Sequence, residues 1–253
     1  MTYNKVFLAG TVCGEPEFTM DSERGDVVYI KLHINRKDIG KTEHVTVAIF
    51  DEELMTRALE EVKDGDYFVL TNGRIVTQNY TKTSTIICPN CQNVDYKQTK
   101  AEKTEIEVHN FEIMKGIDKD LAVGINKVFL MGNVCSQLNY RPGVNNGKDY
   151  VKYKLAINRV GKRKGNKTAD YPFIVSFNKE ATNASKYLKP ASEILIEGAV
   201  QEREIAQKNP YSCPSCGHDS TPKAKSIVRE IITAKVEYIN INKEEEDELE
   251  DEE

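Results

Sequence analysis

One pattern of residues occurs twice in this chain, at positions 122 to 125 apart. Three segments of the first half return in the same order in the second half: Asn4–Cys13 as Asn126–Cys135, Lys31–Arg36 as Lys154–Arg159, and Cys88–Cys91 as Cys213–Cys216. This period is much longer than the roughly 20–50 residues of solenoid repeats. The sequence therefore predicts two copies of one domain in tandem.

The boundary between the copies is expected in the polar stretch 116–125, which separates two strand-like segments. A length of 253 residues is enough for two small domains. We therefore predict one domain over residues 1–117, a second over 118–243, and an acidic tail over 244–253.

Each copy has a pattern of three strands, one helix and two further strands. In 27–35 apolar residues alternate with polar ones, and 45–49 continues the alternation, as half-buried strands require. Asp51 is a plausible N-cap of a helix, and two more strands are expected at 67–78 and 104–114, joined by a long hairpin. This order is that of the OB fold. The predicted fold class is thus mostly β, with two tandem five-stranded OB barrels, each with one short helix, and a disordered acidic tail.

The charge of the chain is unevenly distributed. Residues 244–253 hold nine acids, which leaves 35 basic and 31 acidic residues elsewhere, a net charge of +4. A run of like charges is expected to be disordered. It either keeps the chain soluble, binds a partner, or competes with nucleic acid for the basic body.

No apolar stretch of the sequence approaches the ~20 residues that a membrane helix needs. The first residues also lack the apolar core of a secretory signal. We therefore expect a cytoplasmic protein with no membrane partner.

Aromatic and basic residues share one predicted outer face of the two barrels. A basic groove that follows phosphates, with aromatic rings that stack on bases, is typical of proteins that bind single strands without sequence preference. The candidate DNA-binding residues are Tyr29, Lys31, Arg36, Phe50, Arg74, Tyr80, Lys152, Lys154, Arg159, Tyr171, Phe173, Phe177 and Arg203. The alternative is that the aromatic row belongs to the core or to a subunit interface.

Four of the six cysteines have the spacing of zinc ligands. Cys88 and Cys91 form one Cys-Pro-x-Cys motif, and Cys213 and Cys216 form the other, each in the hairpin before the last strand of its copy. Structural zinc needs four ligands, so one four-cysteine site with about one zinc per chain is the simplest solution, within a chain or across a dimer. A local site that includes His218, a disulfide or redox pair, and free thiols remain alternatives.

The other two cysteines, Cys13 and Cys135, end the first strand of each copy. We expect them to be small buried apolar residues.

Several of these segments together resemble the bacterial and phage single-stranded DNA-binding proteins, usually called SSB. The resemblance is carried by Asn4–Gly10, Glu15–Phe18, Ile34–Arg36, Gly73–Tyr80, Thr104–Val108, Phe173–Lys179, Ala184–Lys189 and Ile196–Gly198. It covers nearly all of residues 4–240, once per copy. It implies a protein that binds single-stranded DNA in replication, recombination or repair.

The resemblance also implies particular residues and partners. It implies base stacking at His44, Phe50, Tyr80, Tyr171 and Phe177. Members of this family function with four OB folds, so a chain with two implies a homodimer. The acidic tail of the family recruits replication and repair proteins, whereas its usual members lack the paired cysteines found here.

Other functions are less well supported by the sequence. A tandem OB protein that binds RNA, or a zinc-bridged adaptor that binds protein, is the main alternative. An enzyme is not indicated, because the sequence has no phosphate-binding glycine-rich loop, no His-Glu-x-x-His motif, and four scattered histidines. We therefore predict no catalytic residues.

Overall fold

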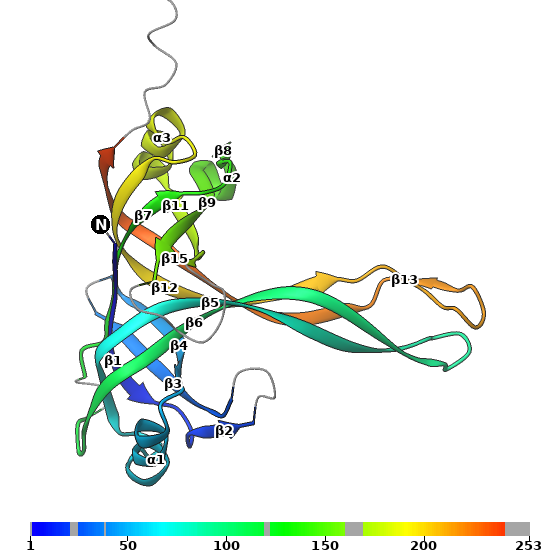
Figure 1. Cartoon of the computed structure of the whole chain (residues 1–253), viewed down its shortest axis with the longest axis horizontal. Helices are drawn as coiled ribbons and strands as arrows, with labels where there is room; N and C mark the ends of the chain where they lie inside the picture. The colour runs from blue at the N-terminus through cyan, green and yellow to red at the C-terminus, as the bar shows by residue number, and fades with distance from the viewer. Residues whose placement is uncertain (1, 21–24, 38, 119–121, 160–168, 241–253) are drawn as a thin grey trace, which may run out of the picture.

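The computed structural model describes residues 2–20, 25–37, 39–118, 122–159 and 169–240. Most of these residues are in strands, which form two barrels and a long arm that projects sideways from the junction between them (Figure 1). None of the helices in these ranges has the length and apolar character needed to cross a bilayer. The predicted acidic tail lies outside the described residues.

Barrel one is formed by the first half of the chain. Its elements are β1 (Tyr3–Val12), β2 (Glu17–Thr19), β3 (Val27–Arg36), β4 (Lys41–Ile49), α1 (Glu52–Glu61), β5 (Tyr67–Ile87) and β6 (Val94–Met114). The strands pair in the closed order β1, β3, β4, β6, β5 and back to β1, with β4 and β6 parallel. This closure confirms the OB fold predicted from the element order.

Barrel two repeats this plan. Its elements are β7 (Ile125–Val134), β8 (Asn139–Gly143), α2 (Val144–Gly147), β9 (Lys148–Asn158), β10 (Ala169–Asp170), β11 (Phe173–Phe177), α3 (Asn178–Tyr187), β12 (Glu193–Lys208), β13 (Tyr211–Ser212), β14 (Asp219–Ser220) and β15 (Lys223–Asn240). The closed order is β7, β9, β11, β15, β12 and back to β7. The single turn α2 adds a helix that the sequence did not predict.

The barrel cores follow the strand alternation read from the sequence. Val28, Ile30 and Leu32 are fully buried on the inner side of β3. The rings of Phe68 and Phe111 stack at 5.0 Å between centroids within barrel one. The predicted cap of α1 is also present, because the Asp51 carboxylate accepts a hydrogen bond from the Leu54 N–H at 3.0 Å.

The two barrels are joined edge to edge through their first strands. β1 and β7 pair antiparallel, with Val6 opposite Val128, Asn4 opposite Leu130 and Leu8 opposite Asn126. Val6 and Val128 are matching positions of the repeat, so a pseudo-two-fold axis passes between them. One continuous sheet thus links the two copies, and this pairing removes the exposed edge of each first strand.

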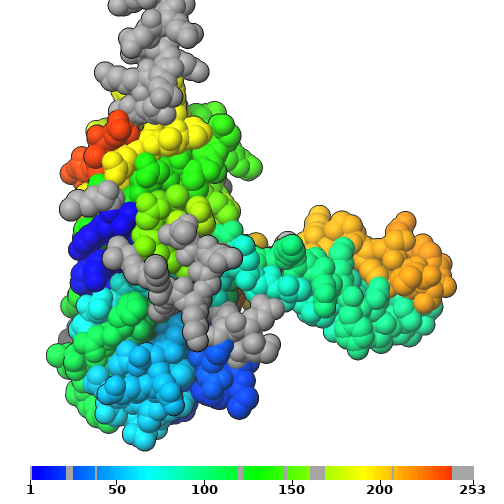
Figure 2. Space-filling model, viewed as in Figure 1, coloured from blue at the N-terminus to red at the C-terminus, as the bar shows by residue number. Residues whose placement is uncertain are grey.

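The arm consists of two β-ribbons that continue beyond the barrels. One ribbon is the far part of β5 and β6, and the other is the far part of β12 and β15 (Figure 1). They contact each other through Lys82, whose Nζ donates to Ser226 Oγ at 3.0 Å, and through Lys97, which donates to the Pro210 carbonyl at 3.1 Å. The long hairpins expected from the sequence are therefore regular ribbons, and Figure 2 shows them as one narrow protrusion.

Candidate nucleic-acid interface and cysteine cluster

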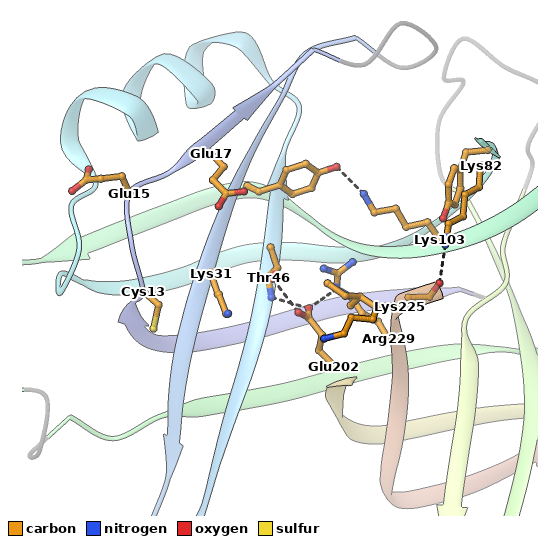
Figure 3. A pocket seen from close by; sticks show the side chains of 14 residues that line it. Cys13, Glu15, Glu17, Lys31, Thr46, Lys82, Lys103, Glu202, Lys225 and Arg229 are labelled. Carbon is orange, nitrogen blue, oxygen red and sulfur yellow. Dashed lines mark hydrogen bonds and ion pairs between the residues drawn. The ribbon is translucent and has the colours of Figure 1, made fainter. Parts of the chain in front are cut away.

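A groove of about 480 Å³ lies where the base of the arm faces β3 and β4 of barrel one (Figure 3). Its basic lining residues are Lys31, Lys82, Lys103, Lys225 and Arg229, and its acidic ones are Glu15, Glu17 and Glu202. Glu202 is already engaged, because it accepts hydrogen bonds from Thr46 and Arg229. Lys103 and Lys225 are paired as well, with Glu105 and Glu204, so Lys31 and Lys82 are the lining cations that would attract phosphates.

A second groove of about 470 Å³ lies on the side of the arm toward barrel two. Its lining includes Lys97, Lys100, Lys154 and Phe173. Four arm residues line both grooves: Tyr80, Lys82, Ser226 and Ile227. The two grooves therefore meet on the arm and form one path from barrel one to barrel two.

Aromatic side chains on this path are partly exposed and contact lysines. The Lys152 ammonium lies 4.0 Å and that of Lys154 4.7 Å from the centre of the Phe173 ring. Tyr29 is held more firmly, since its hydroxyl donates to Glu105 at 2.9 Å and accepts from Lys103 at 2.8 Å. Burial, the main cause, raises the pKa of Tyr29. It therefore lines the groove as a neutral phenol.

Other predicted aromatics lie in different surroundings. Phe177 lies 5.6 Å from Tyr150 between ring centroids and lines a third hollow of about 300 Å³ between the barrels, together with Arg36. Tyr171 and Phe50 are half-buried, and the Tyr171 N–H donates to Thr77 Oγ1 at 2.9 Å. His44 lies beside His33, with 3.3 Å between ring nitrogens.

Several predicted DNA-binding cations are paired with carboxylates of the protein. The pairs are Arg36–Glu43, Arg74–Glu107, Lys152–Glu230, Lys154–Glu102, Arg159–Asp170 and Arg203–Glu230. Arg159 also donates to the Thr77 carbonyl of the other barrel at 3.1 Å, and Arg36 to that of Asn126 at 3.4 Å. These two arginines thus connect the barrels, whereas Lys31 is exposed in the groove.

The arm supplies groove residues that the sequence reasoning did not select. Lys82, Lys100, Lys103 and Arg229 line one or both grooves. They could have been found from the period-two pattern, which continues through the hairpins and places alternate side chains on one face.

The four paired cysteines meet at the far end of the arm. Their sulfurs all lie within 4.8 Å of one another, with Cys88 3.7 Å from Cys216 and Cys91 3.6 Å from Cys213. Sulfurs around a tetrahedral zinc with bonds of about 2.3 Å would be about 3.8 Å apart. The cluster has the donor set and spacing to hold a metal ion, and both motifs come from one chain.

Matching turns aim the cysteines at one point. In the first, the Gln92 N–H donates to the Cys88 carbonyl at 3.0 Å, and in the second, the Gly217 N–H donates to that of Cys213 at 2.8 Å. Burial opposes ionisation of Cys213, but hydrogen bonds from the N–H groups of Ser215 and Cys216 and from the side chains of Tyr211 and Cys91 together outweigh it and lower its pKa to about 6. A thiolate, which is the form that binds metals, is therefore favoured there.

The structure distinguishes the alternatives for the cysteines only in part. His218 is not a member of the cluster, so the four-cysteine arrangement is the one that the geometry brings together. The expectation for the remaining two cysteines is wrong. Cys13 is half-exposed and Cys135 is exposed, because each lies just after the end of its first strand, where the barrel wall no longer covers it.

Residues 125–214 match the model of the Single-strand binding protein family. Among curated proteins, the chain is 25% identical to single-stranded DNA-binding protein 3 of Clostridium acetobutylicum over 117 residues, which is 46% of this chain and 71% of that protein. It is 30% identical to the single-stranded DNA-binding protein of Oceanobacillus iheyensis over 84 residues, 32% of this chain and 50% of that protein. The matched region therefore spans between half and about seven tenths of these relatives.

Among solved structures, the wild-type single-stranded DNA binding protein from Thermus aquaticus has the same fold, with a TM-score of 0.63 at 14% identity. The similarity covers 94% of each chain, so it includes both barrels. The resemblance found in the sequence is thereby confirmed: residues 125–214 match the Single-strand binding protein family, and the chain as a whole has the fold of the Thermus aquaticus protein.

Proposed function

We propose that this chain binds single-stranded DNA without sequence preference and protects it during replication, recombination or repair. The observation that carries the proposal is the continuous path along the two grooves, which meet on the arm at Tyr80, Lys82, Ser226 and Ile227. A single strand, unlike a duplex, is flexible enough to follow a path that passes from one barrel over the arm to the other.

Two kinds of contact would hold the strand. Lysines such as Lys31 and Lys82 would bind phosphates, which makes the affinity fall steeply with salt. Tyr80 and Phe173 would stack on bases, each contributing roughly 1–3 kcal/mol. Neither contact recognises the edges of the bases, so binding would not depend on the DNA sequence. Neither contact requires a chemical reaction on the DNA.

We further propose that the cysteine cluster binds one zinc ion per chain as a structural metal. Cys88 and Cys91 lie at the end of one ribbon, and Cys213 and Cys216 at the end of the other, so a metal would tie the two ribbons together. The small core beneath them contains Ile86 and Tyr211 besides two of the cysteines. Because this core is small, a bound metal ion would contribute to the folding stability of the tip of the arm.

The assembly and partners of the chain belong to the same proposal. A homodimer would bring four barrels together, as the family resemblance implies. The acidic tail would bind replication or repair proteins in the cytoplasm, and its charge suits a basic partner.

The test is a titration of the full chain into fluorescent oligo(dT) of increasing length, with duplex DNA and oligo(U) as competitors. We expect tight binding that strengthens with length, weakens with salt and is poorly competed by duplex. Preference for oligo(U) would move the function to RNA. The absence of binding to any single strand would overturn the proposal in favour of a protein adaptor.

A further inference from the structure

A second cluster of metal-binding side chains lies on barrel one, away from the tip of the arm. The Cys13 sulfur and one ring nitrogen each of His33 and His44 all lie within 4.8 Å of one another. The two histidine nitrogens, His33 Nδ1 and His44 Nε2, are 3.3 Å apart. Nitrogens around a tetrahedral zinc with bonds of about 2.0–2.1 Å are about 3.3 Å apart.

Three strands bring these residues together. His33 and His44 are direct partners in the antiparallel pair of β3 and β4, so their side chains are on the same face of the sheet. Cys13 follows β1, and its N–H donates to the Lys31 carbonyl of β3 at 2.8 Å, which places the thiol beside that face. The strands of the barrel therefore bring the three side chains together.

We propose that Cys13, His33 and His44 form a second transition-metal site of the zinc class. One thiolate and two imidazoles suit zinc, cobalt and copper and do not suit magnesium or calcium, which require oxygen ligands. Three protein ligands leave a fourth position for water or another small ligand. Lys31 on the same strand opposes a cation at this place, whereas the carboxylate of Glu202 favours one.

The repeat itself provides a comparison. In barrel two the positions that match Cys13, His33 and His44 are occupied by Cys135, Ala156 and Tyr171. Asn133 pairs with Ala156 as Thr11 pairs with His33, so the backbone geometry is the same. Barrel two keeps the cysteine but lacks the imidazoles, which restricts the site to barrel one.

The experiment compares the zinc content of three full-length proteins. Each is loaded with excess Zn²⁺ in reducing buffer, passed over a chelating resin, and analysed for metal and protein. The variant carries His33→Ala and His44→Tyr, the residues that barrel two has at these positions, so the barrel is expected to fold. The control carries Cys135→Ser, which alters a cysteine at the matching place without altering the proposed site.

We expect the wild type and the control to hold one more zinc per chain than the double variant. The measured quantity is the difference in zinc content between the proteins, so it does not depend on whether the four-cysteine cluster is filled. The measurement does not involve DNA. His44→Tyr alone should weaken the affinity for this zinc by more than roughly 10–100-fold. That factor is the loss expected when only an outer-shell partner of a ligand is removed, so a larger loss indicates a direct ligand. Equal zinc in all three proteins would overturn the proposal.

A second readout identifies the ligands. Cobalt in place of zinc should give the wild type visible absorption from a site with one thiolate, in addition to that of any cobalt at the four cysteines. Cys13→Ser should remove this part of the spectrum. A spectrum that is unchanged by Cys13→Ser would show that the thiol does not bind metal.

Discussion

Tyr80 lies at the meeting point of the two grooves, on the side of β5 where the arm leaves barrel one. Its repeat counterpart is Ile205, which lines only the groove toward barrel two. Only the aromatic ring can stack on a base, so the two copies are expected to contribute unequally.

Replacement of this ring therefore tests the stacking. Tyr80→Ala should weaken oligo(dT) binding by roughly 5- to 150-fold, the equivalent of about 1–3 kcal/mol for one stacked base. Fluorescence titration at fixed salt measures it. Tyr187→Ala, which removes an exposed tyrosine of α3, is the control and should have no effect. If both variants bind like the wild type, Tyr80 does not stack.

Arg159 is a cation that is paired with a carboxylate of the protein itself. Its guanidinium contacts the Asp170 carboxylate at 2.6 Å, where the exposed fractions of the side chains are 14% and 2%. Arg159→Ala would leave this carboxylate buried with the Thr77 N–H at 2.7 Å as a remaining donor. We expect a loss in the free energy of unfolding of about 3 kcal/mol, the lower end for a broken buried pair.

Urea denaturation measures this loss, and Arg203→Ala is the matched control. Arg203 is 47% exposed, and its partner Glu230 retains Lys152, so we expect a change below about 1 kcal/mol. An Arg159→Ala protein with unchanged stability but weaker DNA binding would contradict the structural role.

The sequence located the basic residues on the expected strands. It could not distinguish a cation that can bind a phosphate from one that is paired with a carboxylate of the protein. Arg36 is the last residue of β3 and Arg159 follows β9, and both contact the opposite barrel. Their partners are up to 90 residues away in sequence. No local pattern carries that information.

At the scale of elements, the arm is the feature that sequence patterns described least well. The alternation of side chains predicted strands at 67–78 and 104–114, whereas β5 and β6 extend to Ile87 and from Val94. The far part of these strands is rich in threonine and lysine. One face of β5 is half-buried there, but its side chains are mostly polar, so the sequence shows little apolar alternation. The element order and the helix cap were predicted because each depends on local spacing. The meeting of the cysteines was predicted because the repeat places both motifs in equivalent hairpins and zinc needs four ligands.

Removal of metal from the cysteine cluster should loosen the tip of the arm and leave the barrels intact. We expect faster amide exchange at residues 84–98 and 209–222 after chelation or in Cys213→Ser, because few buried side chains hold this region. Exchange within β7 and β9 of barrel two should not change. Hydrogen exchange with mass spectrometry measures both, and Cys135→Ser is the control.

The opposite outcome is equally clear. If chelation leaves exchange at the tip unchanged, the cluster does not act as a structural metal site. Equal loss of protection in the barrels would instead mean that the cysteines support the whole fold.

At the scale of the whole molecule, the pairing of β1 with β7 makes the chain an internal dimer of barrels. The register is centred on Val6 and Val128, and matching asparagines support it on both sides. Asn4 exchanges hydrogen bonds with the Ile75 backbone, and Asn126 does the same with that of Val200. Duplication of one sequence thus produced an interface whose two halves are equivalent.

The charge of the whole chain predicts an effect of the tail on DNA binding. Deletion of residues 244–253 removes nine acids and leaves a basic protein. We expect tighter binding to oligo(dT) at low salt and no difference at high salt, because screening weakens attraction between the tail and the basic grooves. Titration at two salt concentrations measures it. An unchanged affinity at low salt would restrict the tail to solubility or partner binding.

The central claim is that one DNA strand occupies both grooves and crosses the arm between them. Ultraviolet crosslinking of the full chain to one long oligo(dT), followed by mapping of the modified peptides, tests it most directly. The account predicts crosslinked peptides from the part of β5 that contains Tyr80 and from β11 with Phe173. Both should be found in complexes that contain one protein chain per oligonucleotide. Crosslinks confined to one barrel, or located on the helices α1 and α3, would contradict it.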